Sequence, residues 1–201
     1  MTKVLAMLTL LTFGCVPKTQ HDQLQQQFRQ LKKKANAMAN AQLEVYNELK
    51  DDLSAPINRG IVDLSLDEWG RIVVGVSSDV LFESGSSVLS ESGRQEIAKL
   101  GRILARSSDR VFRIEGHTDR NPIATEQFPN NWYLGSARAI VVLEQLVASG
   151  LSPRQLSAGS HADNRPVGRV DANNRRIEIV VEPDLTEMPG YQRIRNEAEE
   201  N

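Results

Sequence analysis

The residues best suited to chemistry in this 201-residue chain lie in the stretch GHTDR, from Gly116 to Arg120. A histidine and an aspartate two residues apart could hold a metal ion, transfer protons or bind a charged ligand. A zinc site usually needs three protein ligands, and His117, Asp119 and the distant His161 match no zinc spacing such as H-E-x-x-H. The sequence therefore predicts no metal, no cofactor and no catalysis, which leaves ligand binding as the interpretation.

A partner for Asp119 is predicted on the helix that follows. Asp119 lies just beyond a predicted strand, VFRIEG, where many α/β folds bind ligands. A helix is expected from Asn131 to Ala148, and Asn131, Leu134 and Arg138 share one of its faces at i, i+3 and i+7. An arginine and an aspartate together match a zwitterion, because guanidinium binds carboxylate and carboxylate binds ammonium. The alternative is a simple ion pair between Asp119 and Arg138.

The pattern of apolar residues predicts the elements that position this pair. Runs typical of strands occupy residues 61–76, 111–116, 154–160 and 175–183. The first run contains a Trp69-Gly70 turn, and a helix is expected after Ser90 or Ser92 in addition to the one over 131–148. The order β-β-α-β-α-β-β predicts an α+β fold, with two helices on one face of a mixed sheet.

Residues 1–14 have the character of an export signal. One lysine precedes an apolar and threonine-containing run from Val4 to Phe13, which is too short to span a bilayer. Gly14 and the only cysteine, Cys15, follow as in a bacterial lipoprotein signal, so cleavage after residue 14 would leave Cys15 to be lipidated. The alternative is an uncleaved N-terminal anchor in which Cys15 is a small hydrophobe.

Residues 15–56 are predicted to form a helical stalk. From Lys18 to about Leu53 the chain is rich in Gln, Lys, Asn and Ala and contains no glycine, which indicates one continuous helix. Eight positions alternate by four and three residues, as in a coiled coil: Leu24, Phe28, Leu31, Ala35, Met38, Gln42, Val45 and Leu49. The stalk could self-associate, with Gln42 as a register device, or remain a solvated spacer.

Charge and length set further limits. The chain has 24 Lys plus Arg against 26 Asp plus Glu, so no basic field exists for binding nucleic acid. Its 40% hydrophobic content suffices for one ordinary domain, which we place at residues 57–183. The charged tail, residues 184–201, is expected to be flexible.

Four motifs in order resemble the outer-membrane protein A (OmpA)-like peptidoglycan-binding domain, between Val73 and Val181. They are LFESGSSVLSESG, IEGHTDR, NNWYLGSARA and NRRIEI. The loop NPIATEQFPNNW is most similar to the flagellar-stator B-subunit branch, whose transmembrane helix has no counterpart in this sequence, so no motor role is implied. The resemblance implies a two-layer α/β sandwich with a mixed sheet, preceded by the helical stalk.

The resemblance also implies a function without turnover. It implies non-covalent binding of diaminopimelate in peptidoglycan stem peptides, in which Asp119 grips the amino group and Arg138 the carboxylate. The implied ligand-binding residues are Asp119, Arg138, Asn131, Leu134 and Thr118, with Asn174 and Arg175 in supporting or structural positions. Anchored by acyl chains in the outer membrane and facing the periplasm, such a protein would tether the membrane to the wall. A second copy and other envelope proteins are further expected partners.

Three departures from the family pattern predict weaker ligand binding rather than a different fold. Gly135 replaces a usual serine, which costs a helix about 1 kcal/mol relative to alanine. Ser160 replaces a usual glycine and would be strained if its φ were positive. The loop over 167–173 is shorter than usual. The alternative function is a structural lipoprotein that docks envelope proteins and does not bind the wall.

Overall fold

The computed structural model describes residues 18–107, 109–184, 186 and 190–199. The predicted signal peptide and Cys15 lie outside these residues, so both stay predictions. The chain divides into two units, and the larger one, Asn40–Leu185, contains every strand that the structure describes. No helix in the described part of the chain is both long enough and apolar enough to span a membrane.

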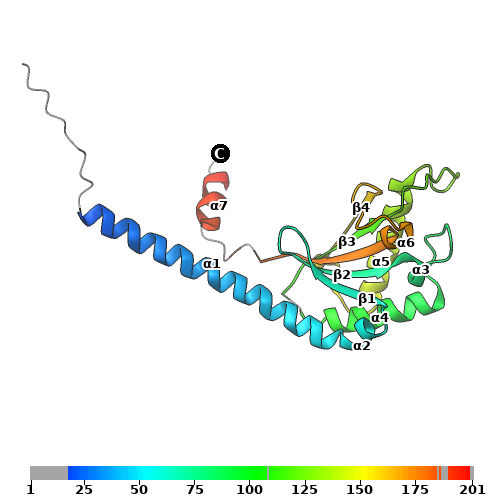
Figure 1. The fold of residues 1–201 in the computed structure, drawn as a ribbon, viewed down its shortest axis with the longest axis horizontal. Coiled ribbons are helices and arrows are strands. Elements are labelled where there is room, and N and C mark those ends of the chain that lie inside the picture. The colour runs from blue at the N-terminus through cyan, green and yellow to red at the C-terminus, as the bar shows by residue number, and fades with distance from the viewer. Residues whose placement is uncertain (1–17, 108, 185, 187–189, 200–201) are drawn as a thin grey trace, which may run out of the picture. The chain divides into compact units, whose positions relative to one another are not determined.

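The larger unit is built on one five-stranded sheet (Figure 1). Its strands are β1 (Val62–Leu66), β2 (Ile72–Ser77), β3 (Phe112–His117), β4 (Leu156–Ala162) and β5 (Arg176–Val181). Their order across the sheet is β1-β2-β5-β3-β4; β3 and β4 pair in parallel, and the other neighbours pair antiparallel. The predicted mixed sheet is therefore confirmed, and so is the hairpin turn, where Gly70 has a φ of +74°.

Two longer helices cover the apolar face of this sheet. They are α4 (Glu91–Leu104) and α5 (Asn131–Ala148), and both contribute residues to one core with β3 and β5. Ser90 caps α4, because its hydroxyl accepts a hydrogen bond from the N–H of Gly93 at 3.0 Å. Shorter elements join these parts: α2 (Ser54–Asn58), α3 (Ser78–Leu81), the 3-10 turn Pro153–Gln155 and α6 (Asp171–Asn174).

Alternation along the strands gives the sheet a second, polar face. On β3, Phe112 and Ile114 are at most 1% exposed and belong to the core. Arg113, Glu115 and His117 alternate with them and therefore point to the opposite face, as successive residues of a strand do. The long helices α4 and α5 pack on the other, apolar face of the sheet.

The stalk helix α1 (Lys18–Asp52) confirms the predicted continuous helix, but its last turns belong to the larger unit. Leu49 and the adjoining Leu53 are 5% and 0% exposed within the hydrophobic core. Gln42, predicted as a register device, instead donates a hydrogen bond to the carbonyl of Gly70 at 3.4 Å. The predicted seam is therefore wrong from Gln42 onward, because these residues already contact their own domain.

The earlier seam positions have a different environment. Leu24, Phe28 and Leu31 are 65%, 66% and 56% exposed. An exposed apolar row at this spacing is what a partner helix would cover in a coiled coil. Self-association through the first part of α1 therefore stays a prediction.

We expect Leu53→Ala to lower the free energy of unfolding by about 2–5 kcal/mol, the usual range for removing a fully buried leucine side chain. Leu43→Ala on α1 is the matched control, because Leu43 is 54% exposed and a change within about 0.5 kcal/mol is expected there. Urea unfolding of both variants, followed by circular dichroism, checks the difference. Equal effects would contradict the packing of this segment on the core.

The C-terminal tail differs from its prediction. Residues Tyr191–Glu199 form a helix, α7. Two pairs at i, i+4 spacing support it: Arg193–Glu197 at 3.7 Å and Arg195–Glu199 at 2.8 Å. The acidic residues that suggested a flexible tail therefore also supply partners within a helix.

Candidate functional site

The site begins where β3 ends. The N–H of Thr118 donates to the carbonyl of Ala162 on β4 at 2.8 Å, and its hydroxyl donates to the carbonyl of Asp119 at 3.0 Å. The side-chain amide of Asn131, at the start of α5, donates to the same Asp119 carbonyl at 3.3 Å and to that of Asn121 at 3.1 Å. Thr118 and Asn131 thus hold the main chain that carries the Asp119 carboxylate.

The Asp119 carboxylate itself is paired with Arg175. Its Oδ2 accepts a hydrogen bond from Nη1 of Arg175 at 2.7 Å, and its Oδ1 accepts one from the N–H of Asn121 at 3.1 Å. The same guanidinium binds Asp79 through Nε at 3.0 Å and Nη2 at 2.7 Å. The hydrogen bonds to Arg175 lower the pKa of Asp79, although burial opposes this shift. The hydrogen bonds to Asp79 and Asp119 raise the pKa of Arg175. Arg175 therefore bridges two carboxylates.

Arg138 is a buried cation whose charge meets no carboxylate directly. The residue is 5% exposed, its Nε donates to the carbonyl of Ser86 at 2.9 Å, and its guanidinium lies 5.1 Å from the centre of the Phe82 ring. Burial lowers the pKa of Arg138, whereas nearby Asp79 raises it. Among the described residues, no carboxylate lies within ion-pair distance of Arg138, and Asp119 pairs with Arg175 instead. The simple Asp119–Arg138 ion pair is therefore not formed.

A cleft of about 300 Å³ opens beside both arginines. Its lining residues are Ser78, Asp79, Phe82, Glu83, Ser84, Gly85, Arg138 and Arg175. Two guanidinium groups thus lie close to the carboxylate of Asp79 and, through Arg175, to that of Asp119. Such a balanced set of charges suits a ligand that carries both an ammonium and a carboxylate.

Asp79, Phe82 and Ser86 were not among the residues predicted from the sequence. All three lie between β2 and α4, in a segment whose glycines and serines indicated only a loop before a helix. Ser77 is the N-cap of α3, and its hydroxyl accepts a hydrogen bond from the N–H of Asp79 at 3.3 Å. This cap is a local signal close to Asp79. The pairing of Asp79 with Arg175, 96 positions later, leaves no local trace.

Two further predicted residues are buried. Leu134 on α5 is buried, at 6% exposure. Asn174 is 3% exposed, and its Oδ1 accepts hydrogen bonds from the N–H groups of Val167 and Gly168 at 2.9 and 3.3 Å. Its Nδ2 donates to the carbonyl of Gly168 at 3.1 Å. Asn174 therefore closes the short loop 167–173 from within.

Two departures from the family pattern compensate each other in space. A Cβ atom on Gly135 would overlap the hydroxyl oxygen of Ser160. That hydroxyl donates to the carbonyl of Gly116 at 3.1 Å and accepts from the N–H of Ala162 at 3.0 Å. The strain considered for Ser160 does not arise there, because the positive φ, +50°, falls on Ala162. The space is thus filled from β4 instead of from α5.

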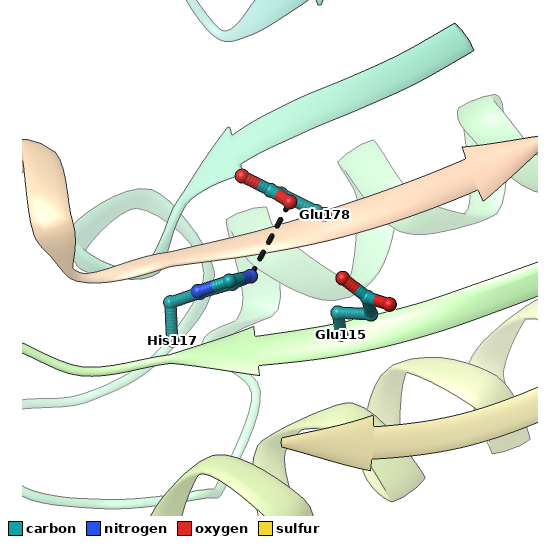
Figure 2. A group of neighbouring side chains, drawn as sticks. All are labelled: Glu115, His117 and Glu178. Atoms are coloured by element: carbon teal, nitrogen blue, oxygen red, sulfur yellow. Dashed lines mark ion pairs between the residues drawn. The ribbon is translucent and has the colours of Figure 1, made fainter. Parts of the chain in front are cut away.

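A second polar group lies on the polar face of the sheet (Figure 2). Nε2 of His117 lies 3.3 Å from Oε2 of Glu178, and Nε of Arg176 donates to Oε1 of Glu178 at 2.6 Å. Burial favours a raised pKa for Glu178, but His117 and Arg176 together outweigh it and hold this pKa at about 2. His161 lies near His117, with 5.2 Å between ring centres, although the two are far apart in sequence.

We expect acid to remove the stabilisation that ionised Glu178 provides. Its folded pKa of about 2 lies below the ordinary 4.5, so this contribution is complete above the ordinary value and declines as pH falls toward the folded one. Thermal melts of wild type and Glu178→Gln, between about pH 6 and about pH 3, should show a melting-temperature gap that narrows in acid. A gap of constant size would show that the carboxylate contributes no pH-dependent stability.

The fold and the charged cleft define a small α+β domain, and comparison with known proteins identifies its family. The OmpA family profile matches residues 81–179. The peptidoglycan-associated lipoprotein of Pseudomonas aeruginosa is 34% identical over 127 residues, which cover 61% of this chain and 71% of that protein. The structure of the cell wall anchor of the T6SS from Pseudomonas aeruginosa is 30% identical, has a TM-score of 0.61, and is matched over 68% of this chain and 97% of that chain. The chain therefore belongs to the OmpA family.

Other relatives are longer than the region that they share with this chain. The chain spans 62% of the length of the Bacillus subtilis protein YtxE, at 29% identity. It spans 48% of the length of Motility protein B of Helicobacter pylori, at 26% identity. These comparisons concern the shared domain and not the whole of either relative.

Proposed function

We propose that this protein binds peptidoglycan non-covalently through its larger unit and, through a lipidated Cys15, tethers the outer membrane to the cell wall. The observation that carries the proposal is Arg138, a buried guanidinium that lines a charged cleft and has no carboxylate partner among the described residues. Buried charges are ordinarily paired, so an anionic ligand group is the partner that this arrangement requires. Two relatives, named as a peptidoglycan-associated lipoprotein and a cell wall anchor, support the same ligand.

The proposed ligand is the end of a diaminopimelate side chain, where one carbon carries an ammonium and a carboxylate. The ligand carboxylate would accept hydrogen bonds from Arg138, and the ammonium would donate to Asp119. Oδ2 of Asp119 already accepts a hydrogen bond from Arg175. Binding therefore requires this oxygen to accept hydrogen bonds from Arg175 and from the ligand ammonium together. Two hydrogen bonds to Asp79 keep Arg175 in place when the ligand binds. Arg175 is therefore a residue that positions Asp119.

Attachment at two ends makes weak wall binding sufficient. Acyl chains on Cys15 would hold the protein in a membrane leaflet, at about 0.8 kcal/mol for each buried methylene. The membrane anchor would then raise the effective concentration of the domain near the wall, as linked binding modules do. Because tethering needs no covalent step, we propose that the protein is not an enzyme.

Sedimentation with purified diaminopimelate-type peptidoglycan tests the proposal. The full-length protein in mild detergent is expected to sediment with the wall, and free diaminopimelate should release it. Asp119→Asn should weaken binding by about 10-fold or more, because a hydrogen bond to a charged group contributes about 1.5–3 kcal/mol. Asp63→Asn, at an exposed position of β1, removes the same charge elsewhere and should sediment like the wild type.

The possible outcomes distinguish a wrong binding site from a wrong ligand. Wild-type sedimentation that Asp119→Asn leaves unchanged would overturn the site while keeping wall binding. A wild type that stays in solution would overturn wall binding and favour a structural lipoprotein that docks envelope proteins. The exposed apolar row of Leu24, Phe28 and Leu31 is the observation that favours this second function.

A further inference from the structure

Two glutamates and two histidines gather on the polar face of the sheet. Figure 2 shows Glu115 and His117 extending from β3 and Glu178 from β5 toward one common space. Glu115 and Glu178 are direct partners in the β3–β5 register, and His161 lies on β4, the other neighbour of β3. Ligand atoms of Glu115, His117 and Glu178 all lie within 4.8 Å of one another.

Two of these side chains are buried with polar atoms that lack hydrogen bonds in the described part of the chain. His117 is 1% exposed and neither of its ring nitrogens is hydrogen-bonded, and Glu115 is 3% exposed with Oε2 in the same situation. Nε2 of His117 lies 3.3 Å from Oε2 of Glu178, and Nε2 of His161 lies 3.0 Å from Oε2 of Glu115. These are ion-pair distances without hydrogen-bond geometry. Buried polar atoms of this kind are costly unless another group satisfies them.

The other oxygen of each glutamate faces an arginine, through a hydrogen bond in one case and an ion pair in the other. Nε of Arg176 donates to Oε1 of Glu178 at 2.6 Å, and Nε of Arg113 lies 2.9 Å from Oε1 of Glu115. Each carboxylate therefore directs its remaining oxygen, Oε2, toward an imidazole nitrogen. Outer partners that fix the orientation of ligating carboxylates are a regular feature of metal sites.

We propose that Glu115, His117, His161 and Glu178 bind one Zn²⁺ ion. Two imidazole nitrogens and two carboxylate oxygens are ligands that Zn²⁺ accepts. At ligand distances of about 2.0–2.2 Å, two ligand atoms of a tetrahedral site lie about 3.3–3.6 Å apart. The two nitrogen–oxygen pairs, at 3.3 and 3.0 Å, are already close to this spacing. The ion would satisfy one ring nitrogen of His117, Nε2, and Oε2 of Glu115, two of the buried atoms that lack hydrogen bonds among the described residues.

The cluster can be reached from solvent. A cleft of about 230 Å³ reaches Glu115 and His161, and its other lining residues are Trp69 and three arginines, Arg71, Arg113 and Arg165. Carboxylates offset the charge of two of these arginines: Arg71 lies 2.6 Å from Asp67, and Arg113 lies 2.9 Å from Glu182 as well as 2.9 Å from Glu115. The guanidinium of Arg165 lies over the Trp69 ring, 5.0 Å from its centre. A cation could therefore approach the ligands without displacing the hydrophobic core.

The proposed ion would have a structural role. Four protein ligands complete a tetrahedral zinc site and leave no position open for a reacting water. The ion would join β3, β4 and β5 on the polar face of the sheet, and two of these strands adjoin Asp119 and Arg175. The inference does not depend on wall binding.

Zn²⁺ binding to the full-length chain tests the proposal. The protein would carry no histidine tag and would have Cys15→Ser in every sample, so that no thiol or tag binds the metal. After treatment with a chelator, equilibrium dialysis against Zn²⁺ should give one equivalent bound. Glu178→Gln and His161→Ala should each weaken Zn²⁺ binding by at least about 10-fold. A loss of about this size is typical even when the replaced residue only hydrogen-bonds a metal ligand.

The third histidine of the chain supplies the control. His21→Ala removes an exposed histidine of α1 and should bind Zn²⁺ like the parent protein. Zn²⁺ should also raise the melting temperature of the parent by more than that of folded Glu178→Gln, because a ligand that binds only the folded state stabilises it by more when it binds more tightly. Absence of bound Zn²⁺ in the parent, or equal binding by the cluster variants, would overturn the proposal.

Discussion

Replacing Gly135 by serine is expected to lower the free energy of unfolding by about 1–3 kcal/mol, the usual cost of forcing extra atoms into a packed core. The change introduces the residue that is usual in the family, yet its Cβ would overlap the Ser160 hydroxyl and lie 3.1 Å from the carbonyl oxygen of Gly116. The backbones of α5 and β3 lie so close together that neither can shift easily to make room for the new Cβ atom. The loss is therefore caused by the serine already present on β4.

The double variant Gly135→Ser/Ser160→Gly should recover much of this loss. Ser160→Gly alone removes two hydrogen bonds, to Gly116 and Ala162, each worth about 1 kcal/mol. In the double variant the new Cβ at position 135 takes the space that the hydroxyl leaves. We expect a favourable coupling of about 1–3 kcal/mol between the two sites, as for other residues in contact.

Urea unfolding of the four proteins measures this coupling. Gly159→Ser is the matched control, because a Cβ on this neighbouring glycine of β4 has nothing within 4 Å, and a change within about 0.5 kcal/mol is expected. If the losses of the two single variants simply add in the double variant, Gly135 and Ser160 do not share one space.

Arg138→Lys is expected to weaken sedimentation with peptidoglycan by about 10-fold or more, although it keeps the positive charge. Lysine carries a compact, strongly hydrated ammonium and cannot bind a carboxylate through two parallel N–H groups. It also lacks the planar group that lies over the Phe82 ring, and it cannot donate from Nε to the Ser86 carbonyl as the arginine does. The variant should therefore lose both the orientation and the hydrogen bonds of the site.

Arg102→Lys, at an exposed position of α4, is the control for this substitution. It should leave sedimentation unchanged, and thermal melts should establish that both variants are folded at the assay temperature. Sedimentation of folded Arg138→Lys at the wild-type level would mean that charge alone suffices and that bidentate recognition is not used.

Local elements followed from the sequence because their signals are local. The period of apolar residues identified the strands and both sheet-covering helices, and Ser90 was correctly among the predicted caps. The long helix α1 was equally evident from composition. Its seam failed from Gln42 onward because a heptad pattern records apolar positions but not which surface will cover them.

The sequence likewise predicted the charged residues of the candidate site but not their partners. Asp119 follows a strand and Arg138 lies on a helix face, so spacing alone singled them out as a charged pair. Their actual partners depend on contacts between distant segments: Arg175 reaches Asp119 across 56 positions and Asp79 across 96. An isolated sequence contains no record of which opposite charge a side chain meets after folding.

Two further relations appeared only in three dimensions. Gly135 and Ser160 were separate departures from a pattern, and His117 and His161 were histidines too far apart in the chain to act together. Parallel pairing of β3 with β4 places His161 beside His117, and the close approach of α5 places Gly135 against Ser160. By itself the sequence determined the elements and the residues capable of binding, since these depend on neighbours along the chain. Tertiary structure decided which of those residues share a space, because strand pairing and helix packing join positions that the chain keeps apart.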